Sequence, residues 1–230
     1  MNTLPIKEYL RGGRGNRPIE NEEEPHVAVV LLIDTSSLMP EWETNEGYEA
    51  CIEALKKDLK ACVKVEIMTI TFDNTARIVQ PFGLIYRTEC QKVKCRGMTS
   101  FHTACDIALD ELRMRTKLYS IFNVPSYKSM MFIVTAGQPS DSKNGVIERL
   151  LKAQEKEVIV CTIVIGNRAN TDFLKSITKG MVLKADKEHI KSAFEWISTS
   201  ISSVIRSPIN EEITLSPPSD HQLKIILKKE

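Results

Sequence analysis

A carboxylate and three hydroxyl groups follow directly on an apolar run near the start of the chain. The run 31–33 ends at Asp34, and Thr35, Ser36 and Ser37 come next. Mg²⁺ prefers oxygen ligands in octahedral geometry, and carboxylate and hydroxyl oxygens can supply them. Asp and Ser side chains also hydrogen-bond to nearby backbone and so close the turn after a strand. The stretch therefore predicts either part of a cation site or a turn cap.

A second set of candidate ligands lies in the middle of the chain and consists of Cys90, Cys95, His102 and Cys105. Thiolates and imidazoles bind Zn²⁺, but this spacing is not one of the common finger or ribbon patterns. The other cysteines fall inside helix-like or strand-like apolar patterns, where a cytosolic protein usually buries them as small hydrophobes. We therefore expect free thiols, with a zinc site as the alternative.

The sequence shows no recognisable catalytic pattern. The four histidines have no partner pattern, and there is no G-x-S-x-G nucleophile turn, no P-loop and no glycine-rich dinucleotide turn. A hydrolase built on Asp34 or Cys105 would need a base within reach, and the sequence indicates none. We expect a protein that is not an enzyme.

The elements that would position these residues alternate between strands and helices. Continuous apolar, β-branched runs predict buried strands over 27–33, 63–72, 129–137, 158–166 and, more briefly, 180–186. Amphipathic stretches between them predict helices. Asp73 and Asn74 form a turn signal, which predicts a hairpin and an antiparallel edge strand near 76–80 that Pro81 ends. The fold class expected is α/β, a doubly wound, mostly parallel, Rossmann-like sheet with one antiparallel edge strand and helices on both faces.

Polar residues follow several of these strands at the point where each strand ends. Asp34 and Ser36 follow the first strand, Thr135 follows another, and Asn167 follows the strand over 158–166. Ligands of such sheets bind beyond the carboxyl ends of the strands. Thr99 precedes the central helix and could reach the same edge, although Thr99 and the next serine could instead form the N-cap of that helix. The pattern predicts a site at this edge of the sheet.

Composition divides the chain into three parts. Residues 1–25 contain RGGRGNRP and an acidic block, and they predict a flexible N-terminal arm. Residues 26–205 contain the alternating elements and predict one domain. Residues 206–230 form a C-terminal extension whose end, QLKIILKKE, alternates like a lone strand.

The charge balance argues against some classes of partner. Lys and Arg number 31 and Asp and Glu number 30, which leaves a net charge of +1. No basic stripe with interleaved aromatic residues appears, as a nucleic-acid binder would need. No apolar run reaches the length of a signal peptide or a membrane span. We expect a cytoplasmic protein with no nucleic-acid and no membrane partner.

Several segments together resemble the von Willebrand factor type A domain. They are VVLLIDTSSLM, ITFDNTARIVQPF, GMTSFHTACDIALDEL, FIVTAGQPSD and AFEWISTSISSVI. The resemblance covers about residues 26–205, including the order of elements and the edge hairpin. Within that family the chain most resembles the TerY-type proteins of bacterial tellurium-resistance gene clusters.

The resemblance implies a metal-ion-dependent adhesion site, in which the pattern D-x-S-x-S, a threonine and the aspartate of a T-D-G loop hold Mg²⁺. Asp34, Ser36 and Thr99 match three of these positions. Leu38 stands at the position of the second serine, and Ala136 stands at that of the T-D-G aspartate. Both a direct ligand and an acidic group are therefore missing, and affinity for hard dications falls with ligand charge. We expect a degenerate site that holds Mg²⁺ weakly or not at all, and no other cofactor.

The resemblance also implies a non-enzymatic protein–protein interaction module that docks its partner at this edge of the sheet. The binding surface expected there consists of Ser37, Leu38, Thr135, Ala136 and Asp141. TerY-type proteins are associated with a kinase-like and a phosphatase-like partner, so an adaptor in a bacterial stress or tellurium-resistance system is expected. The alternatives are Mg²⁺-dependent adhesion through a surviving site, a hydrolase with an unrecognised active site, and a self-assembling protein that pairs its arm or tail with a neighbour's sheet.

Overall fold

Strands and helices alternate along the chain as the hydrophobic pattern predicts. The computed structural model describes residues 17–209, 211 and 215–226. The strands are β1 (Val27–Asp34), β2 (Val65–Phe72), β3 (Ala76–Leu84), β4 (Ser129–Thr135), β5 (Val158–Ile165), β6 (Val182–Ala185) and β7 (Lys224–Ile225). The helices are α2 (Glu41–Lys57), α3 (Leu59–Lys64), α4 (Phe101–Ile121), α5 (Val146–Lys156), α6 (Thr171–Ile177) and α7 (Ile190–Val204), with short 3₁₀ turns η2 (Ile85–Arg87) and η3 (Lys187–His189).

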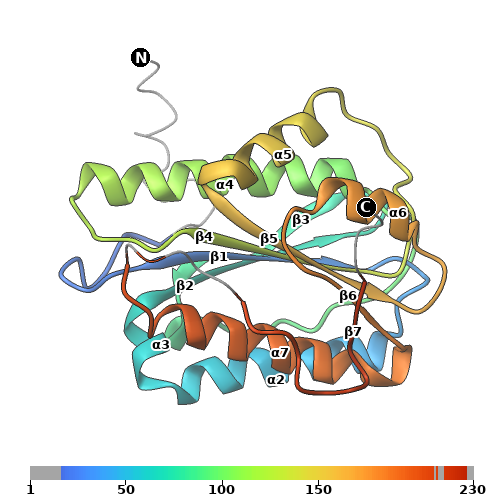
Figure 1. Cartoon of the computed structure of the whole chain (residues 1–230), viewed down its shortest axis with the longest axis horizontal. Helices are drawn as coiled ribbons and strands as arrows, with labels where there is room; N and C mark the ends of the chain where they lie inside the picture. Colours follow the sequence, from blue (N-terminus) through green and yellow to red (C-terminus); the bar gives the residue numbers. More distant parts are fainter. Residues whose placement is uncertain (1–16, 210, 212–214, 227–230) are drawn as a thin grey trace.

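The strands form one seven-stranded sheet in the order β3-β2-β1-β4-β5-β6-β7. The five inner strands, β2, β1, β4, β5 and β6, run parallel to one another. Strands β3 and β7 run antiparallel to them at the two edges. Helices α4, α5 and α6 cover one face, and α2, α3 and α7 cover the other (Figure 1). The expected α/β class is confirmed, and the C-terminal extension adds a second antiparallel edge strand.

Strand β1 shows why this sheet is buried on both faces. Its eight residues are all buried. Val27, Val29, Leu31 and Ile33 pack into the core on the side of α2 and α7, while Ala28, Val30 and Leu32 pack into the core on the other side. Side chains of a strand alternate between faces, so a continuous apolar run fills both cores at once.

The edge strand β3 is longer than its sequence predicts, because Pro81 does not end it. The strand continues to Leu84, and its pairing with β2 is irregular between Ile67 and Ile70. Pro81 and the residue after it lie opposite the single residue Met68, and a further extra residue, Val79, lies between the partners of Thr69 and Ile70. A bulge at a sheet edge tolerates a residue that lacks a backbone N–H, so proline fits there.

Part of the N-terminal arm lies against the domain. The backbone N–H of Arg17 donates to the carbonyl of Phe82 in β3 at 2.9 Å. The Glu20 carboxylate pairs with Arg87 at 2.8 Å, and Glu24 pairs with Lys64 at 3.5 Å. The flexible arm predicted over residues 1–25 therefore has a docked segment over 17–24, while residues 1–16 lie outside the described residues.

The described tail also contributes to the domain. Leu223 is buried, and the N–H of Ile226 donates to the carbonyl of Val182 at 2.8 Å.

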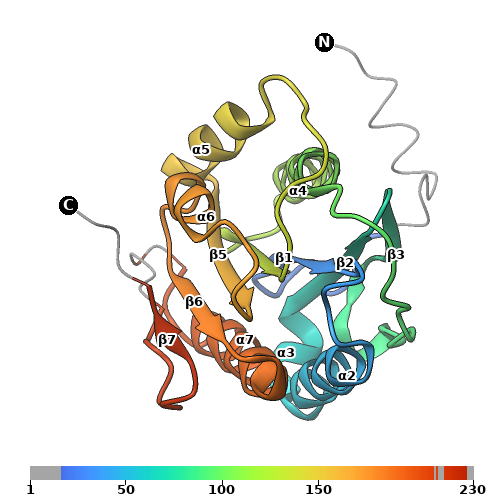
Figure 2. The same cartoon turned by 90° about the vertical axis from the view of Figure 1, so that its right-hand side faces the viewer.

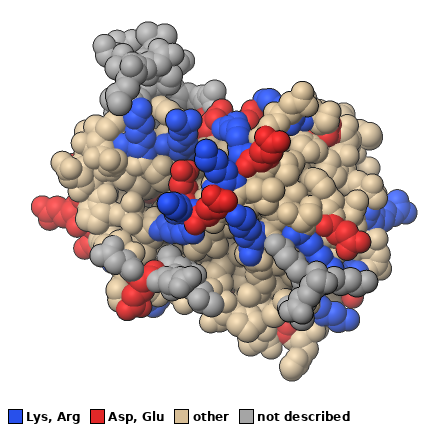
Figure 3. Space-filling model, turned by 45° about the horizontal axis from the view of Figure 1, so that its top comes forward, with Lys and Arg blue, Asp and Glu red and all other residues tan. Residues whose placement is uncertain are grey.

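On the face that carries α4 and α5, Lys and Arg side chains lie interleaved with Asp and Glu, so neither sign dominates (Figure 3). Within the described ranges, no helix has both the length and the apolarity needed to span a bilayer.

Candidate functional site

The carboxyl ends of β1 and β4 bring the loops 34–40, 96–100 and 135–141 together, at the end of the sheet that faces the viewer in Figure 2. Backbone hydrogen bonds join these loops. The N–H of Arg96 donates to the carbonyl of Thr35 at 2.7 Å, and the N–H of Ser37 donates to that of Gly97 at 3.2 Å. The N–H of Ser140 donates to the carbonyl of Thr99 at 2.9 Å. The loops that carry the predicted site residues therefore meet, as expected.

Asp34 is the centre of this arrangement and is fully buried. One carboxylate oxygen accepts a hydrogen bond from the N–H of Ser36 at 2.7 Å. The other accepts from the Thr135 hydroxyl at 2.8 Å and from the N–H groups of Ala136 and Gly137 at 3.1 and 3.2 Å. Asp34 therefore fastens the end of β1 to the loop that follows β4.

The charge of Asp34 is costly in this position. Burial raises the pKa of its carboxyl above the ordinary value, although hydrogen bonds from Ser36 and Thr135 oppose that shift. No cation of the described residues forms an ion pair with it. The carboxylate is thus held by neutral donors, which compensate a buried charge less well than a cation does.

The two hydroxyls that match the metal pattern lie beside Asp34. Ser36 and Thr99 are buried. The Ser36 hydroxyl has no hydrogen-bond partner among the described residues. A Cβ added to Gly137 would lie 2.4 Å from the Thr99 hydroxyl oxygen, so only glycine lets the two loops approach this closely. The structure therefore brings together all three residues predicted to retain the metal pattern.

The two residues that depart from the metal pattern also lie together. Leu38 and Ala136 line one cavity of about 270 Å³, with Ile165 and Gly166 from the end of β5. Leu38 packs against the apolar core of the α2 and α7 face, and Ala136 belongs to that core. Aliphatic side chains thus line part of this hollow, at the place where the pattern would put a hydroxyl and a carboxylate, and charged side chains, among them Asp186 and Glu188, line the rest.

Two exposed apolar side chains lie on segments at this end of the sheet. Trp42, in the first turn of α2, is 76% exposed, and Met98, directly before Thr99, is 60% exposed. Ser37 lies close to Met98, because the Ser37 hydroxyl donates to the carbonyl of the preceding residue, Gly97, at 3.2 Å. The Trp42 and Met98 side chains are both candidates for contact with another protein, because exposed apolar groups are frequent in surfaces that bind proteins.

Asp141, which the sequence predicts to belong to the binding surface, makes hydrogen bonds to helix α4. One of its oxygens accepts from the N–H of His102 at 3.0 Å, and the other accepts from the N–H and the hydroxyl of Thr103, both at 2.8 Å. Burial alone would raise the pKa of Asp141, but these hydrogen bonds outweigh it and hold the pKa below the ordinary value. Ser100 occupies the N-cap position of α4 without a side-chain capping bond. Asp141 therefore caps α4 from a distant loop and is occupied within the fold.

The histidines have partners that sequence reasoning missed. His102 Nδ1 lies 3.3 Å from Asp141, and His26 Nδ1 lies 3.4 Å from Glu66. The sequence shows no partner pattern for these two histidines because both partners are distant along the chain. A polar residue within an otherwise apolar strand run, as at position 66, is the signal that could have indicated one of them.

The alternative zinc set does not converge. Cys90 and Cys95 pack against the core on the α2 and α7 face, whereas Cys105 packs into the core on the α4 face. Burial raises the pKa of Cys90 and of Cys95 to about 12, which disfavours the thiolate that zinc needs. Within the part of the chain that the structure describes, no three His, Cys, Asp or Glu side chains are grouped as metal ligands, and all six cysteines are free thiols.

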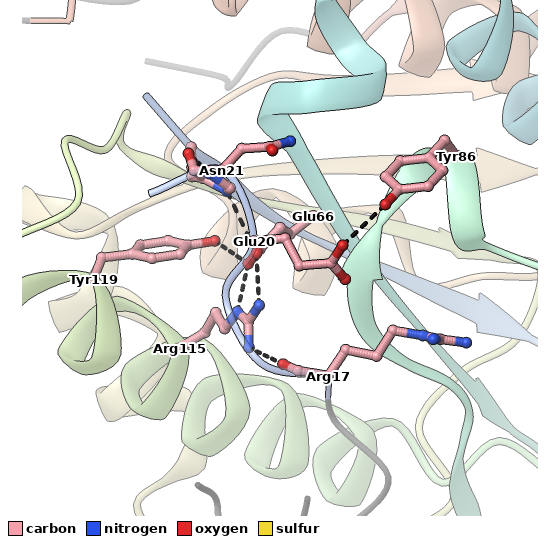
Figure 4. Close-up of polar contacts among 8 residues, drawn as sticks. Arg17, Glu20, Asn21, Glu66, Tyr86, Arg115 and Tyr119 are labelled. Carbon is pink, nitrogen blue, oxygen red and sulfur yellow. Dashed lines mark hydrogen bonds and ion pairs between the residues drawn. The ribbon is translucent and has the colours of Figure 1, made fainter. Parts of the chain in front are cut away.

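A second buried polar cluster lies at the opposite end of the sheet. Glu66 in β2 and Arg115 in α4 are both fully buried, and the guanidinium contacts both carboxylate oxygens, one of them at 2.6 Å (Figure 4). The Tyr119 hydroxyl donates to the same carboxylate. Arg115 also donates to the carbonyl of Arg17 at 2.7 Å, so the docked arm closes this cluster. Its satisfied hydrogen bonds give it a structural role.

The sequence model of the von Willebrand factor type A domain matches residues 28–199. The chain belongs to this family. Such domains form a family of protein-interaction and adhesion modules, and the matched range runs from β1 to α7 and leaves out strand β7. No curated protein matches the chain.

Solved structures share the fold of this von Willebrand factor type A domain at low sequence identity. The von Willebrand factor type A protein from Catenulispora acidiphila has a TM-score of 0.58 at 15% identity, over 76% of this chain and 42% of that one. The pilus adhesin SpaC from Lactobacillus rhamnosus GG has a TM-score of 0.63 at 14% identity, over 83% of this chain and 31% of that one. Proximal thread matrix protein 1 from the mussel byssus has a TM-score of 0.55 at 14% identity, over 78% and 48%. The chain spans less than half the length of these three structures.

Proposed function

We propose that this von Willebrand factor type A domain is a non-enzymatic protein-docking module that binds its partner at the carboxyl end of the sheet without a bridging metal ion. The observation that carries the proposal is that Leu38 and Ala136, from two different loops, line the same cavity beside Asp34. The resemblance to TerY-type proteins supports a cytoplasmic adaptor role in a bacterial stress or tellurium-resistance system. It also supports a kinase-like or phosphatase-like partner.

The available oxygen ligands do not fit Mg²⁺ well. Asp34 supplies the only carboxylate among the matched positions, and its oxygens already accept four hydrogen bonds. The Ser36 hydroxyl is free to bind an ion, and Thr99 lies close by. Mg²⁺ demands a near-octahedral set of oxygens and gains affinity from anionic ligands. The matched positions supply one carboxylate, which is already hydrogen-bonded, and two hydroxyls. They therefore offer too few oxygen ligands and too little negative charge for Mg²⁺.

Metal-dependent binding of the partner is the competing hypothesis. The buried Ser36 hydroxyl, which has no hydrogen-bond partner among the described residues, favours it. One structure of proximal thread matrix protein 1 has a zinc-occupied metal-ion-dependent adhesion motif, with a TM-score of 0.51 and 15% identity to this chain. An enzyme is disfavoured because Asp141, the half-buried partner of the half-buried His102, is engaged in capping helix α4. A general base needs reach to a substrate proton.

Thermal unfolding in MgCl₂ and MnCl₂ tests the metal half of the proposal. We expect millimolar metal to leave the melting temperature of the wild type unchanged. We expect it to raise that of Leu38→Ser/Ala136→Asp, because both changes point into the cavity and restore an oxygen ligand and a charge. A metal ion that binds only the folded state raises the free energy of unfolding by about 2.7 kcal/mol when its concentration is a hundred times its Kd. A magnesium shift in the wild type that Asp34→Ala abolishes would establish the metal-dependent mode instead.

Affinity capture in EDTA tests the docking half. The tagged wild-type chain should retain its partner from a lysate of its own host without divalent metal. Trp42→Asp and Met98→Asp should lose that partner, because both side chains lie exposed at the carboxyl end of the sheet. Leu59→Asp is the matched control, since Leu59 is 83% exposed at the start of α3, at the opposite end. Loss of the partner in EDTA, or equal loss in the control, would contradict the proposal.

A further inference from the structure

Two adjoining hollows continue the surface from the proposed docking site along β5, β6 and β7. The first is the cavity of about 270 Å³ with its partly aliphatic lining. The second has a volume of about 160 Å³ and shares Asn167 and Asp186 with the first. Lys184 of β6 and Lys224 of β7 line this second hollow. An apolar pocket therefore leads directly into a basic one.

The four cations around these hollows are Arg168, Lys184, Lys187 and Lys224. None of them forms an ion pair with any described residue. The hollows contain two carboxylates, those of Asp186 and Glu188, so positive charge is in excess. Elsewhere on this domain many cations pair with acids, as Arg149 does with Asp106. Four cations without an ion pair to a described residue thus line these two adjoining hollows.

Two of these cations face each other in a way that does not help the fold. Lys184 and Lys224 are directly opposite in the antiparallel pairing of β6 with β7. Opposed residues of an antiparallel pair lie on the same face, and like charges at such positions destabilise the sheet. An anionic group between the two ammonium groups would remove this repulsion. The opposed lysines thus offer a place where an anionic group of a partner would be stabilised.

The size of the first hollow limits what can enter it. Sites for cofactors and drug-sized ligands usually have volumes of about 300–1,000 Å³. The cavity above Leu38 and Ala136 is smaller than that range. It suits one large aliphatic or aromatic side chain, which is how anchor residues of protein interfaces bind.

We propose that these two hollows bind an acidic segment of the partner protein, which inserts one large apolar side chain above Leu38 and Ala136 and places carboxylates between Lys184 and Lys224. This inference rests on the proposed docking function and names the chemistry of the partner. The pocket supplies the anchor, and the lysines select for acidic residues beside it. Association is then steered by charge and weakens as salt rises.

The test uses random peptides of about twelve residues, an ordinary length for segments that bind in grooves, displayed on phage and selected on the full chain in EDTA. Enriched peptides are then labelled with fluorescein, and their affinity is measured by anisotropy. We expect the enriched peptides to combine one Leu, Ile, Met, Phe or Trp with neighbouring Asp or Glu residues. We expect Lys184→Glu/Lys224→Glu to weaken their binding about tenfold or more, because attraction becomes repulsion.

Two controls make this result specific. Lys57→Glu/Lys60→Glu makes the same change in charge at exposed, unpaired lysines near the opposite end of the sheet, and it should change affinity by less than about twofold. Lys184→Gln/Lys224→Gln removes the repulsion within the pair, so it should fold at least as well as the wild type and still weaken the peptides. Circular dichroism of each variant establishes that it is folded.

Several outcomes would overturn the inference. Enrichment of basic or purely apolar peptides would do so, as would no enrichment, or preferential binding of a single-stranded oligonucleotide over acidic peptides. If acidic peptides bind but lose affinity with Trp42→Asp and not with the Lys184 and Lys224 variants, the inference fails while the proposed docking function stands. If the host partner is lost in EDTA, the proposed function fails whatever the peptides do.

Discussion

Removal of the Arg115 side chain should destabilise this domain more than any surface change. Arg115 and Glu66 are both inaccessible to solvent, and the guanidinium contacts both oxygens of the carboxylate (Figure 4). Burial alone would raise the pKa of Glu66, but hydrogen bonds from His26 and Arg115 outweigh it and hold the pKa below the ordinary value. The carboxylate is therefore charged in the folded protein and depends on these partners.

The size of the expected loss of stability follows from the contacts that Glu66 would keep in Arg115→Met. Glu66 would keep the Tyr119 hydroxyl and the His26 ring, but among the described residues it would lose the one cation that contacts both of its oxygens. Removing one partner of a buried ion pair costs about 3–5 kcal/mol. That is a large share of the 5–15 kcal/mol or so by which a domain is usually stable. Arg115→Lys keeps the charge but loses the two-pronged contact, so it should fall between the wild type and the methionine variant.

Equilibrium unfolding in urea measures these differences, with the double variant Glu66→Leu/Arg115→Met as the decisive comparison. The double variant buries no charge and should lose less stability than the sum of its two single variants, with a coupling energy of about 3 kcal/mol. It should still be less stable than the wild type, because the Tyr119 hydroxyl and the Arg17 carbonyl lose partners. Two outcomes would refute the view that each buried charge depends on the other. One is a double variant whose loss of stability equals the sum of the losses in the two single variants, and the other is a loss below about 1 kcal/mol in Arg115→Met.

The same pair predicts the direction of the pH dependence. The folded-state pKa of Glu66 lies below its ordinary value of 4.5. Its contribution to stability is therefore complete above that ordinary value and is lost as the pH falls through the lower folded-state value. The stability difference between wild type and Arg115→Met should narrow on acidification. A difference that stays constant between neutral and acid pH would mean that Glu66 is not held in its charged form by Arg115.

Two further predictions concern the caps and the edges of the fold. Asp141→Ala should cost about 1–2 kcal/mol, because the first turn of α4 loses its acceptors, whereas Ser100→Ala should be within about 0.5 kcal/mol of the wild type in the same urea titrations. An equal loss in both would mean that Asp141 does not cap the helix. Ending the chain at Gln222 removes buried Leu223 and strand β7, and it should cost about 1.5–3 kcal/mol in thermal unfolding. A truncated chain as stable as the full one would show that β7 is peripheral.

The fold was predictable from sequence because its strongest signals are local. The run 27–33 is apolar at every position and rich in β-branched residues, which is typical of a strand covered on both faces. The meeting of Asp34, Thr99 and Ala136 was predictable as well, because the carboxyl ends of parallel strands share an edge. These inferences need only the order of the elements, which the alternation of patterns gives.

Long-range polar pairing was not predictable in the same way. Glu66 and Arg115 are 49 residues apart, and Asp141 caps a helix that begins about 40 residues earlier. Periodicity carries no information about which charge meets which. A single Glu within the run 63–72 does indicate that a buried charge needs a partner, since unpaired buried charges are very unfavourable. The partner itself follows only from the packing of α4 on the sheet.

The two buried carboxylates of the sheet show how its ends differ. Glu66, near the amino end, has a cation and a tyrosine as partners, and the docked arm closes over them. Asp34, at the carboxyl end, has neutral donors from its own loop and from that after β4, and burial raises its pKa. The first arrangement stabilises the fold. The second leaves a buried charge under-compensated in order to hold two loops together, and stability is commonly sacrificed in this way where a surface has a function.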